Sequence, residues 1–305
     1  MIIGSYYITV AIITGIYVIL ALSLNIITGM AGQPSLGHAA FFGIGAYTSA
    51  ILTTRYGLPF GVGLAAAMAA AGLFGAILGM ISVRVRDDFL AITTIGINFV
   101  VVAVFLYFPF FGESYGVGGI PLPSLSGWEF NKPAYLALVL IGVGVTLFVS
   151  RWVQQSWFGL GLAALREDDE AAEASGIDTK LFKVAAFSIG TALAGGAGSL
   201  YAHFMMFISP NDFGFPVSIT ILSMVVVGGL ATLRGPILGA VLLSLAPEVF
   251  RPIMEYRTLL YGVLLVVMMR FLPAGLLGDE GPVMRWVRAR GSNRRREAAV
   301  DGRSW

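Results

Sequence analysis

The polar residues best placed to act on a solute stand in the stretch 29–38, GMAGQPSLGH, directly after a long apolar run. Its central glycine and proline disfavour a continuous helix. Backbone groups freed at membrane depth are tolerated only against protein or a water-filled cavity. Gln33, Ser35 and His38 could therefore hydrogen-bond a polar solute beside a transport pathway, or they could satisfy the broken backbone alone.

Further polar residues interrupt the neighbouring apolar runs. Asn25 precedes the stretch, and Thr93, Thr94 and Asn98 are expected near one helical face, at spacings of four and five. Buried hydroxyls and amides commonly bond a neighbouring helix, so a pathway role and a packing role are both open. Asn25, Thr94 and Asn98 join the three residues above as candidates for the substrate pathway. His203 is predicted to be a packing or interfacial residue rather than a ligand.

Several kinds of chemistry are excluded by what the sequence lacks. It has no cysteine and two widely separated histidines, and few acidic residues fall in the apolar runs, so neither a metal site nor a proton relay is expected. No nucleophile and base pair appears within those runs, so the chain is not expected to be an enzyme. The phosphate-binding pattern G-x-x-x-x-G-K-[ST] is absent. We expect no cofactor in this chain, and ATP hydrolysis would have to come from a separate subunit.

The apolar runs define the fold class. Hydrophobic residues make up 57% of the 305 positions and charged residues only 12%, about half the charged share of a soluble domain. A helix needs roughly 20 apolar residues to cross a bilayer. We therefore predict an all-α integral membrane protein, a polytopic bundle of about eight to ten transmembrane helices with interrupted or re-entrant segments. The runs are 8–27, 60–83, 89–111, 135–149, 184–208, 217–233, 237–250 and 259–271.

Basic residues predict the orientation, because cytoplasmic loops collect Lys and Arg. Seven arginines follow residue 271, which places the C-terminus in the cytoplasm. Counting back through about nine crossings, the polar loop 154–182 is also cytoplasmic and the N-terminus lies outside. The chain thus divides into a transmembrane domain, 1–278, and a basic cytoplasmic tail, 279–305. No positively charged segment precedes the first apolar run, so the first helix is expected to be retained rather than cleaved as a signal.

The loop 154–182 is predicted to carry a short helix that binds a second protein. Residues 163–176 favour a helix, and Gly176 would end it. Charged side chains cover most of its surface, whereas Leu165, Ala172 and Ile177 offer a small apolar contact. Such a helix gains little by packing on its own bundle, so another chain is its expected destination.

Two runs carry a small residue at every fourth position, which lets helix backbones approach closely in lipid. We predict tight packing along both stripes, with a lining role in a pathway as the alternative, and expect the stripes to mark inner helices. The first stripe is Gly63, Ala67, Ala71, Gly75 and Gly79, and the second is Ala186, Gly190, Ala194, Gly198 and Ala202.

An internal echo relates residues 32–45 and 229–240. Each is a glycine-rich break that leads into a short apolar helix. Repeats with interrupted helices are typical of transporters, where they lie near the binding site.

Three stretches carry a resemblance to a known family. They are 24–47, LNIITGMAGQPSLGHAAFFGIGAY; 165–177, LREDDEAAEASGI; and 209–239 with its VGGL and RGPILG elements. These resemble the membrane-spanning permease subunits of bacterial ABC importers for branched-chain amino acids, of the LivM and LivH type and most like LivM. The resemblance covers about residues 8–277. Residues 89–98 are also similar to a family segment, but members often have an acidic residue where Asn98 stands, so a charge-based role there is not implied.

The resemblance implies a translocation subunit for branched-chain or related hydrophobic amino acids in the bacterial inner membrane. Such a permease would pair with a second, homologous permease, two cytoplasmic ATP-binding subunits and an external solute-binding protein, and would bind no nucleic acid. A short loop helix seated in an ATPase cleft would pass its motion into the bundle. The residues that would couple to the ATPase are Arg166, Glu167, Asp168, Glu170, Ala171 and Gly176.

Other functions remain open at this point. Permeases for urea, short amides or sugars share much of the same signature. An ion-coupled secondary transporter is a different class, and the scarcity of acidic residues within the apolar runs argues against it.

Overall fold

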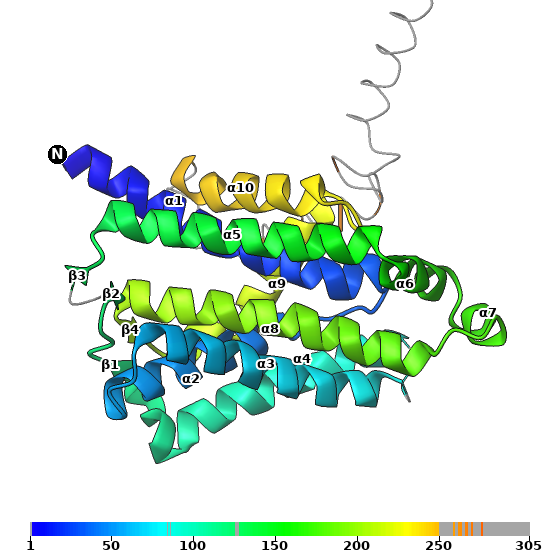
Figure 1. Cartoon of the computed structure of the whole chain (residues 1–305), viewed down its shortest axis with the longest axis horizontal. Coiled ribbons are helices and arrows are strands. Elements are labelled where there is room, and N and C mark those ends of the chain that lie inside the picture. Colours follow the sequence, from blue (N-terminus) through cyan, green and yellow to red (C-terminus); the bar gives the residue numbers. More distant parts are fainter. Residues whose placement is uncertain are drawn as a thin grey trace, which may run out of the picture.

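The computed structural model describes residues 2–249, apart from 84, 86 and 126–127, together with seven isolated positions between 259 and 276. The chain is a bundle of long helices that run along one axis of the molecule (Figure 1). Among the described residues the only extended elements are four strands of two residues each, so the predicted all-α class is confirmed. The predicted run 259–271 falls mostly outside the described residues, and the tail 279–305 lies wholly outside them.

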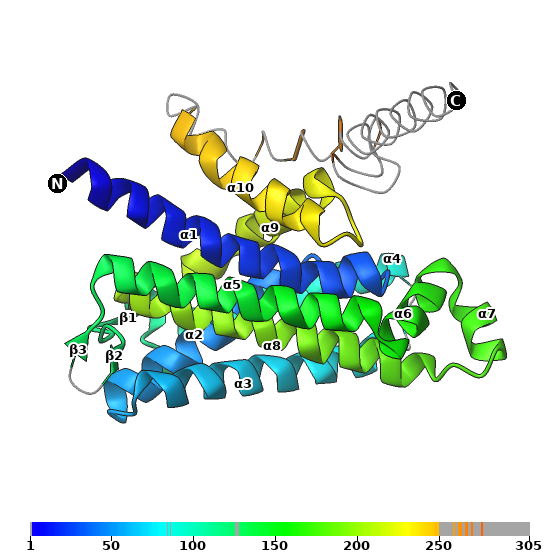
Figure 2. The same ribbon diagram turned by 45° about the horizontal axis from the view of Figure 1, so that its top comes forward.

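Most helices follow one another through short connections, but α4 and α5 are joined by the longer segment 108–131. The longest helices lie side by side (Figures 1 and 2). A π-helical turn, Asn25–Met30, extends the first helix, and short 3-10 turns cover Pro109–Phe111, Glu113–Tyr115 and Pro210–Phe213. The α-helices are α1 (Ile2–Leu24), α2 (His38–Arg55), α3 (Phe60–Ser82), α4 (Asp87–Tyr107), α5 (Lys132–Gln155), α6 (Trp157–Glu167), α7 (Asp169–Ala174), α8 (Thr179–Met205), α9 (Phe215–Gly228) and α10 (Arg234–Val249).

Two small antiparallel ladders close one end of the bundle, opposite α6 and α7 (Figure 1). Strand β1 (Val117–Gly118) pairs with β4 (Phe207–Ile208), and β2 (Ser124–Leu125) pairs with β3 (Trp128–Glu129). The first ladder therefore ties the connection between α4 and α5 to the end of α8.

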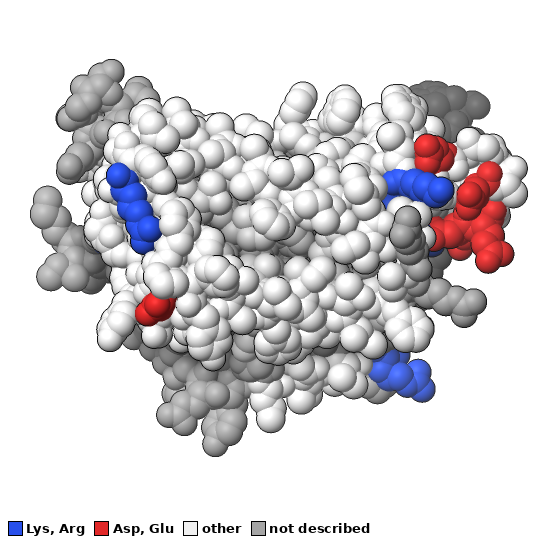
Figure 3. All heavy atoms as spheres, turned by 90° about the horizontal axis from the view of Figure 1, so that it is seen from below, with Lys and Arg blue, Asp and Glu red and all other residues white. Residues whose placement is uncertain are grey.

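Six helical segments in the described part are long and apolar enough to cross a membrane. Helix α2 has 18 residues but begins inside the bundle, and the apolar part of α10 is shorter still. Lys, Arg, Asp and Glu lie at the two ends of the molecule, and the face between them shows none (Figure 3). This distribution fits a chain that spans a bilayer along its helix axes. The six segments are Tyr6–Met30, Phe60–Ser82, Phe89–Tyr107, Lys132–Gln155, Thr179–Met205 and Pro210–Gly228.

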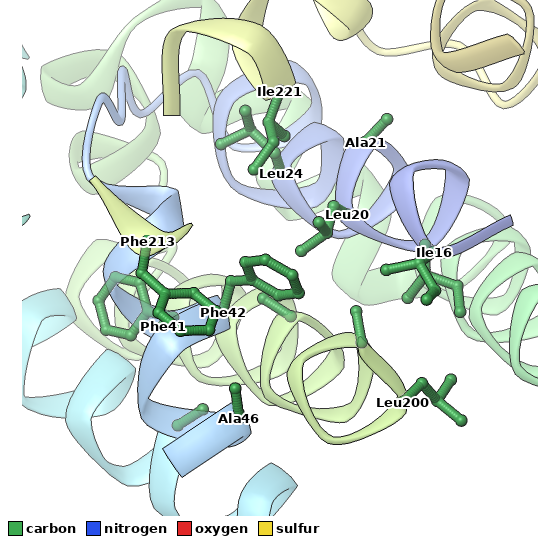
Figure 4. Close-up of a cluster of buried hydrophobic side chains, with 14 of the residues drawn as sticks. Ile16, Leu20, Ala21, Leu24, Phe41, Phe42, Ala46, Leu200, Phe213 and Ile221 are labelled. Atoms are coloured by element: carbon green, nitrogen blue, oxygen red, sulfur yellow. The ribbon is translucent and has the colours of Figure 1, made fainter. Parts of the chain in front are cut away.

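Helices α1 and α8 form the centre of the bundle. In their spanning windows 72% and 67% of residues are buried, against 33% for α3 and 22% for α4 and α5. Side chains of α1, α2, α8 and α9 meet in one apolar cluster (Figure 4). The expectation that both small-residue stripes mark inner helices is wrong for α3, because only the face that carries its stripe is buried.

Small residues let these helices approach closely. A Cβ atom added at Gly75 of α3 would overlap the Thr191 side chain of α8, and one at Gly79 would lie 2.7 Å from the Cα atom of Val184. The stripe on α8 faces other helices: a Cβ at Gly190 would lie 2.6 Å from Ile27, and one at Gly198 would overlap the Phe42 carbonyl of α2. Close approach without bulky side chains is how helices associate in lipid.

We predict that Gly198→Ala destabilises the chain, because the added methyl group meets the backbone of α2. The expected loss is about 1–3 kcal/mol, the usual cost of overpacking. Gly144→Ala on α5 is the matched control, since a Cβ there meets nothing within 4 Å. Thermal unfolding in detergent should show a lower midpoint for Gly198→Ala and an unchanged or higher midpoint for Gly144→Ala. Equal midpoints for the two variants would contradict the packing argument.

Candidate functional site

The helix that starts at α1 is interrupted inside the protein, as the sequence predicted. Its last turn widens into the π-helical turn, residues 31–37 are non-helical, and α2 begins at His38. Gly32 has a φ of +69°, a left-handed conformation that glycine adopts readily. Gln33 and Ser35 are each 2% exposed and His38 is fully buried. We call residues 31–38 the interruption.

Side chains from α4 and α9 accept two backbone N–H groups, one within the interruption and one at the start of α2. The Leu36 N–H donates to Thr94 Oγ1 at 2.9 Å, and the Ala39 N–H donates to Ser218 Oγ at 3.0 Å. Gly37 packs so closely on Thr94 that an added Cβ would overlap its carbonyl. The interruption is therefore seated against α4 and α9 within the bundle.

His38 is oriented by a serine of α1. Its Nε2 atom lies 2.8 Å from Ser23 Oγ, and the Ser23 hydroxyl donates to the Leu20 carbonyl at 2.8 Å. Because that hydroxyl has one proton, both hydrogen bonds form when His38 Nε2–H is the donor. Nδ1 of the same ring then presents a free lone pair.

Four of the six candidate pathway residues hold a buried polar atom that has no hydrogen-bond partner among the described residues. The atoms are Gln33 Oε1, Ser35 Oγ, His38 Nδ1 and Asn98 Oδ1. Leaving a buried donor or acceptor unsatisfied costs about 1–3 kcal/mol. Unused hydrogen-bonding capacity of this kind is what a site for a hydrogen-bonding solute or for water requires.

Asn25 uses its amide to hold a second glycine-rich segment. Its Nδ2 donates to the Thr232 carbonyl at 2.9 Å, and its Oδ1 accepts the Ala231 N–H at 2.9 Å. A Cβ added at Gly29 would lie 2.6 Å from the Ala231 nitrogen. The glycine-rich segment 229–240 therefore meets the chain at Asn25 and Gly29, just before the first segment of the internal echo begins. Both ends of the Asn25 amide are engaged there, unlike the side chains within the interruption.

Thr94 and Asn98 lie on the inner face of α4, and Thr93 does not. Asn98 Nδ2 donates to the Phe213 carbonyl at 3.1 Å, whereas the Thr93 hydroxyl bonds the Phe89 carbonyl of its own helix. The prediction of one shared face is wrong for Thr93. A spacing of five turns a side chain about 140° around a helix, and a spacing of four only about 40°.

His203 has the packing role that the sequence predicted. It is fully buried, with Nδ1 2.7 Å from the Pro121 carbonyl and Nε2 3.0 Å from Ser49 Oγ. Ser49 Oγ in turn lies 2.7 Å from Ser199 Oγ. The imidazole thereby ties the connection after α4 to α2 and α8.

The loop expected to carry one helix over 163–176 carries two. Helix α6 ends at Glu167, and Asp168 caps α7 by accepting the Glu170 and Ala171 N–H groups at 2.9 and 3.0 Å. An Asp side chain that bonds nearby backbone N–H groups favours a new helix start over helix continuation. Gly176, with φ +87°, ends α7 as predicted, and the Ile177 N–H bonds the Ala172 carbonyl as in a Schellman motif.

The apolar side of this loop packs on the chain's own bundle. Leu165 and Ala172 are 3% and 4% exposed, so the prediction that they form the contact to another protein is wrong. Leu165 belongs to a cluster with Ile26 and Phe182, because α6 folds back against the end of α1. The charged side remains outside and gathers over α6 and α7 (Figure 3); its exposed members are Arg166, Glu167, Asp168, Glu170 and Glu173.

Helix α6 lies directly against the interruption. A Cβ added at Gly32 would lie 3.0–3.2 Å from the Cγ, Cα and Cβ atoms of Arg166. Two features that are far apart in sequence, the charged loop and the interruption, are therefore in contact. No group of His, Cys, Asp and Glu that could hold a metal ion occurs among the described residues.

Comparison with known proteins decides the family. A model of the branched-chain amino acid transport system permease component matches residues 6–270. The chain belongs to this permease family. No solved structure matches the chain.

Relatives of the permease include proteins named LivM and LivH. The permease is 36% identical to the high-affinity branched-chain amino acid transport system permease protein LivM of Escherichia coli K12, over 90% of this chain and 71% of that protein. LivM of Salmonella typhimurium is 35% identical over the same shares. The Escherichia coli K12 permease protein LivH is 24% identical, over 86% of this chain and 91% of that protein.

Three contributors to the site were not found from the sequence of the permease. Ser23, Ser218 and Thr232 lie in or beside apolar helices, where isolated hydroxyls are common and carry no distinct spacing. The glycine-rich segment that holds Thr232 was noticed through the internal echo and the family resemblance, neither of which singles out Thr232 itself. Their roles follow from which helices become neighbours.

We predict that Asn25→Leu, which keeps the branched shape of the side chain but removes both hydrogen bonds, destabilises the permease. The Ala231 N–H and the Thr232 carbonyl lose their partner, at an expected cost of about 1–3 kcal/mol. Thr93→Val should leave stability unchanged, since that hydroxyl bonds only its own helix on an outer face. Thermal unfolding in detergent, with limited proteolysis of the segment between α9 and α10, measures both variants. A stable, protease-resistant Asn25→Leu variant would refute the role given to this amide.

Proposed function

We propose that this permease is the translocation subunit of an ATP-driven importer for branched-chain amino acids in a bacterial inner membrane. The observation that carries the proposal is the buried interruption, where Gln33, Ser35 and His38 each hold an unused hydrogen-bonding atom inside a largely apolar bundle. The family assignment and the names of its relatives support the choice of solute.

The chemistry of the interruption suits an amino acid. Gln33 Oε1, His38 Nδ1 and Asn98 Oδ1 are hydrogen-bond acceptors without a described partner. An α-ammonium group has three donors and no acceptor, so it complements such a set. Apolar side chains around the interruption would accept a branched aliphatic group. Interrupted helices at membrane depth are a recurrent way to build such a site.

Further subunits complete the proposed importer. The relatives include LivM and LivH, two permease proteins of one kind of transport system, which supports pairing with a second, homologous permease. Two ATP-binding subunits would supply the hydrolysis and an external binding protein would deliver the solute, so the permease itself would need no cofactor. No phosphate-binding G-x-x-x-x-G-K-[ST] pattern occurs in the sequence, which agrees with a separate ATPase.

The charged end of the molecule is the proposed docking point for the ATPase. Helices α6 and α7 project at the end where α1 finishes (Figure 2), and Arg166, Glu167, Asp168, Glu170 and Ala171 are exposed there. That end would face the cytoplasm, with the N-terminus outside and the C-terminal tail inside. Exposed charges would set orientation and association rate more than affinity.

We predict ATP-dependent uptake of leucine into proteoliposomes that hold the permease with its partner permease, ATPases and binding protein. Urea should not be taken up, and the isolated permease should neither hydrolyse ATP nor transport leucine. Gln33→Ala and Ser35→Ala should lower uptake about tenfold while the subunits still assemble, because each removes part of the proposed site.

Thr93→Ala is the matched control for this assay, since that hydroxyl bonds only the Phe89 carbonyl of its own helix on the outer face of α4. Uptake of urea in place of leucine would overturn the choice of solute. Unchanged leucine uptake by both interruption variants would overturn the placement of the pathway.

We also predict that a cysteine introduced by Ala171→Cys crosslinks to the ATPase in the assembled importer. The permease has no cysteine of its own, so the product would report this position alone. Gly176→Val should uncouple hydrolysis from uptake, because a β-branched residue is strained at a φ of +87° and the end of α7 must rearrange. Labelling of Ala171→Cys from the external side of intact cells would contradict both the orientation and the docking point.

A further inference from the structure

Lys183 is a buried cation near the start of α8. Its side chain is 7% exposed, and its Nζ atom forms an ion pair with Asp169, the first residue of α7. Lysine is almost never buried to this degree unless it is paired. The Asp169 side chain is 40% exposed, so the pair joins the surface of the loop to the interior of the bundle.

Helix α7 has few other attachments to the bundle. Ala172 is its one buried residue, and the other positions from Glu170 to Ala174 are exposed. Asp168 and residues 175–178 connect it at either end to α6 and α8 through turns. Apart from the turn 175–178, whose Ile177 packs on the cluster around Phe182, a rotation or displacement of α7 would reach α8 through the Asp169–Lys183 pair and the Ala172 contact.

The turn of α8 that holds Lys183 is locked to the rest of the bundle. A Cβ added at Gly79 of α3 would lie 3.4 Å from the Lys183 carbonyl and 2.7 Å from the Cα atom of Val184. Further along α8, Gly190 packs on Ile27 and Gly198 packs on α2. Helices packed backbone to backbone cannot slide without separating, so a displacement at Lys183 would move the inner helices together.

We propose that the Asp169–Lys183 ion pair is the mechanical link that carries ATPase-driven movement of α7 into α8 and thus into the bundle. The inference rests on the proposed docking of the ATPase at α6 and α7, and it assigns a positioning role to two residues outside the proposed docking set. Asp169→Asn would leave the buried charge of Lys183 without compensation, and Lys183→Gln would remove the cation that holds the partly exposed Asp169, so either change weakens the contact that the link depends on.

The test measures leucine uptake per ATP hydrolysed in the reconstituted importer. Asp169→Asn and Lys183→Gln should each lower this ratio about tenfold, a normal size for a coupling between two sites. Hydrolysis itself and crosslinking of Ala171→Cys to the ATPase should persist. Combining Asp169→Lys with Lys183→Asp should restore the ratio, which a general loss of folding would not allow.

Lys180→Gln is the matched control, because Lys180 lies on the same helix three positions earlier and is exposed. It should keep the uptake ratio of the parent protein. A normal ratio in Asp169→Asn and Lys183→Gln, with the crosslink present, would overturn the link and leave the docking proposal standing. If the double variant Asp169→Lys with Lys183→Asp misfolds, or folds without regaining the parent ratio of leucine uptake to ATP hydrolysis, that result also counts against the link. Absence of the crosslink in the otherwise unmodified chain would overturn the docking proposal and the link with it.

Discussion

Backbone polar groups inside a bilayer must find their hydrogen-bond partners within the protein, and the interruption after α1 is where this requirement is hardest to meet. Residues 31–37 leave the helical pattern while buried or half-buried, so neighbouring helices must supply acceptors. Thr94 of α4 and Ser218 of α9 do so, and Asn25 bonds the segment between α9 and α10. The positions of α4, α9 and α10 around α1 are thus tied to one local break in helical structure.

The interruption also contacts the charged end of the permease. Gly32 packs on Arg166, and the cluster around Leu165 includes Ile26 in the last turns of the first helix. Helix α8 runs from the charged loop to the opposite end, where His203 bonds the Pro121 carbonyl. Small residues along α8 keep α1, α2 and α3 within backbone contact of it. Helix α8 therefore connects the two ends of the bundle and packs beside the interruption, where Ala31 belongs to the same cluster as Ala186.

Features that depend on local chain chemistry were predictable from the sequence. The apolar runs defined the membrane class, the glycine and proline of 29–38 located the interruption, and Gly176 marked the end of α7. Predictions failed where a side chain had a choice of partner. Asp168 caps a new helix instead of continuing the old one, and Leu165 packs inside rather than facing another protein. Thr93 was grouped with Asn98 although a spacing of five turns it outward.

The sequence by itself determined which segments can lie in lipid, where a helix must break and which chain surface carries charge, because hydropathy, glycine and proline act on the chain locally. Only the tertiary structure decided which polar atoms are used and which are left over. Asn25 and Gln33 look alike in the sequence, yet the first has both amide ends engaged and the second holds an unused oxygen. That difference arises because a hydrogen bond needs its partner at the right distance and angle, and residues some 200 positions apart meet only when the helices pack.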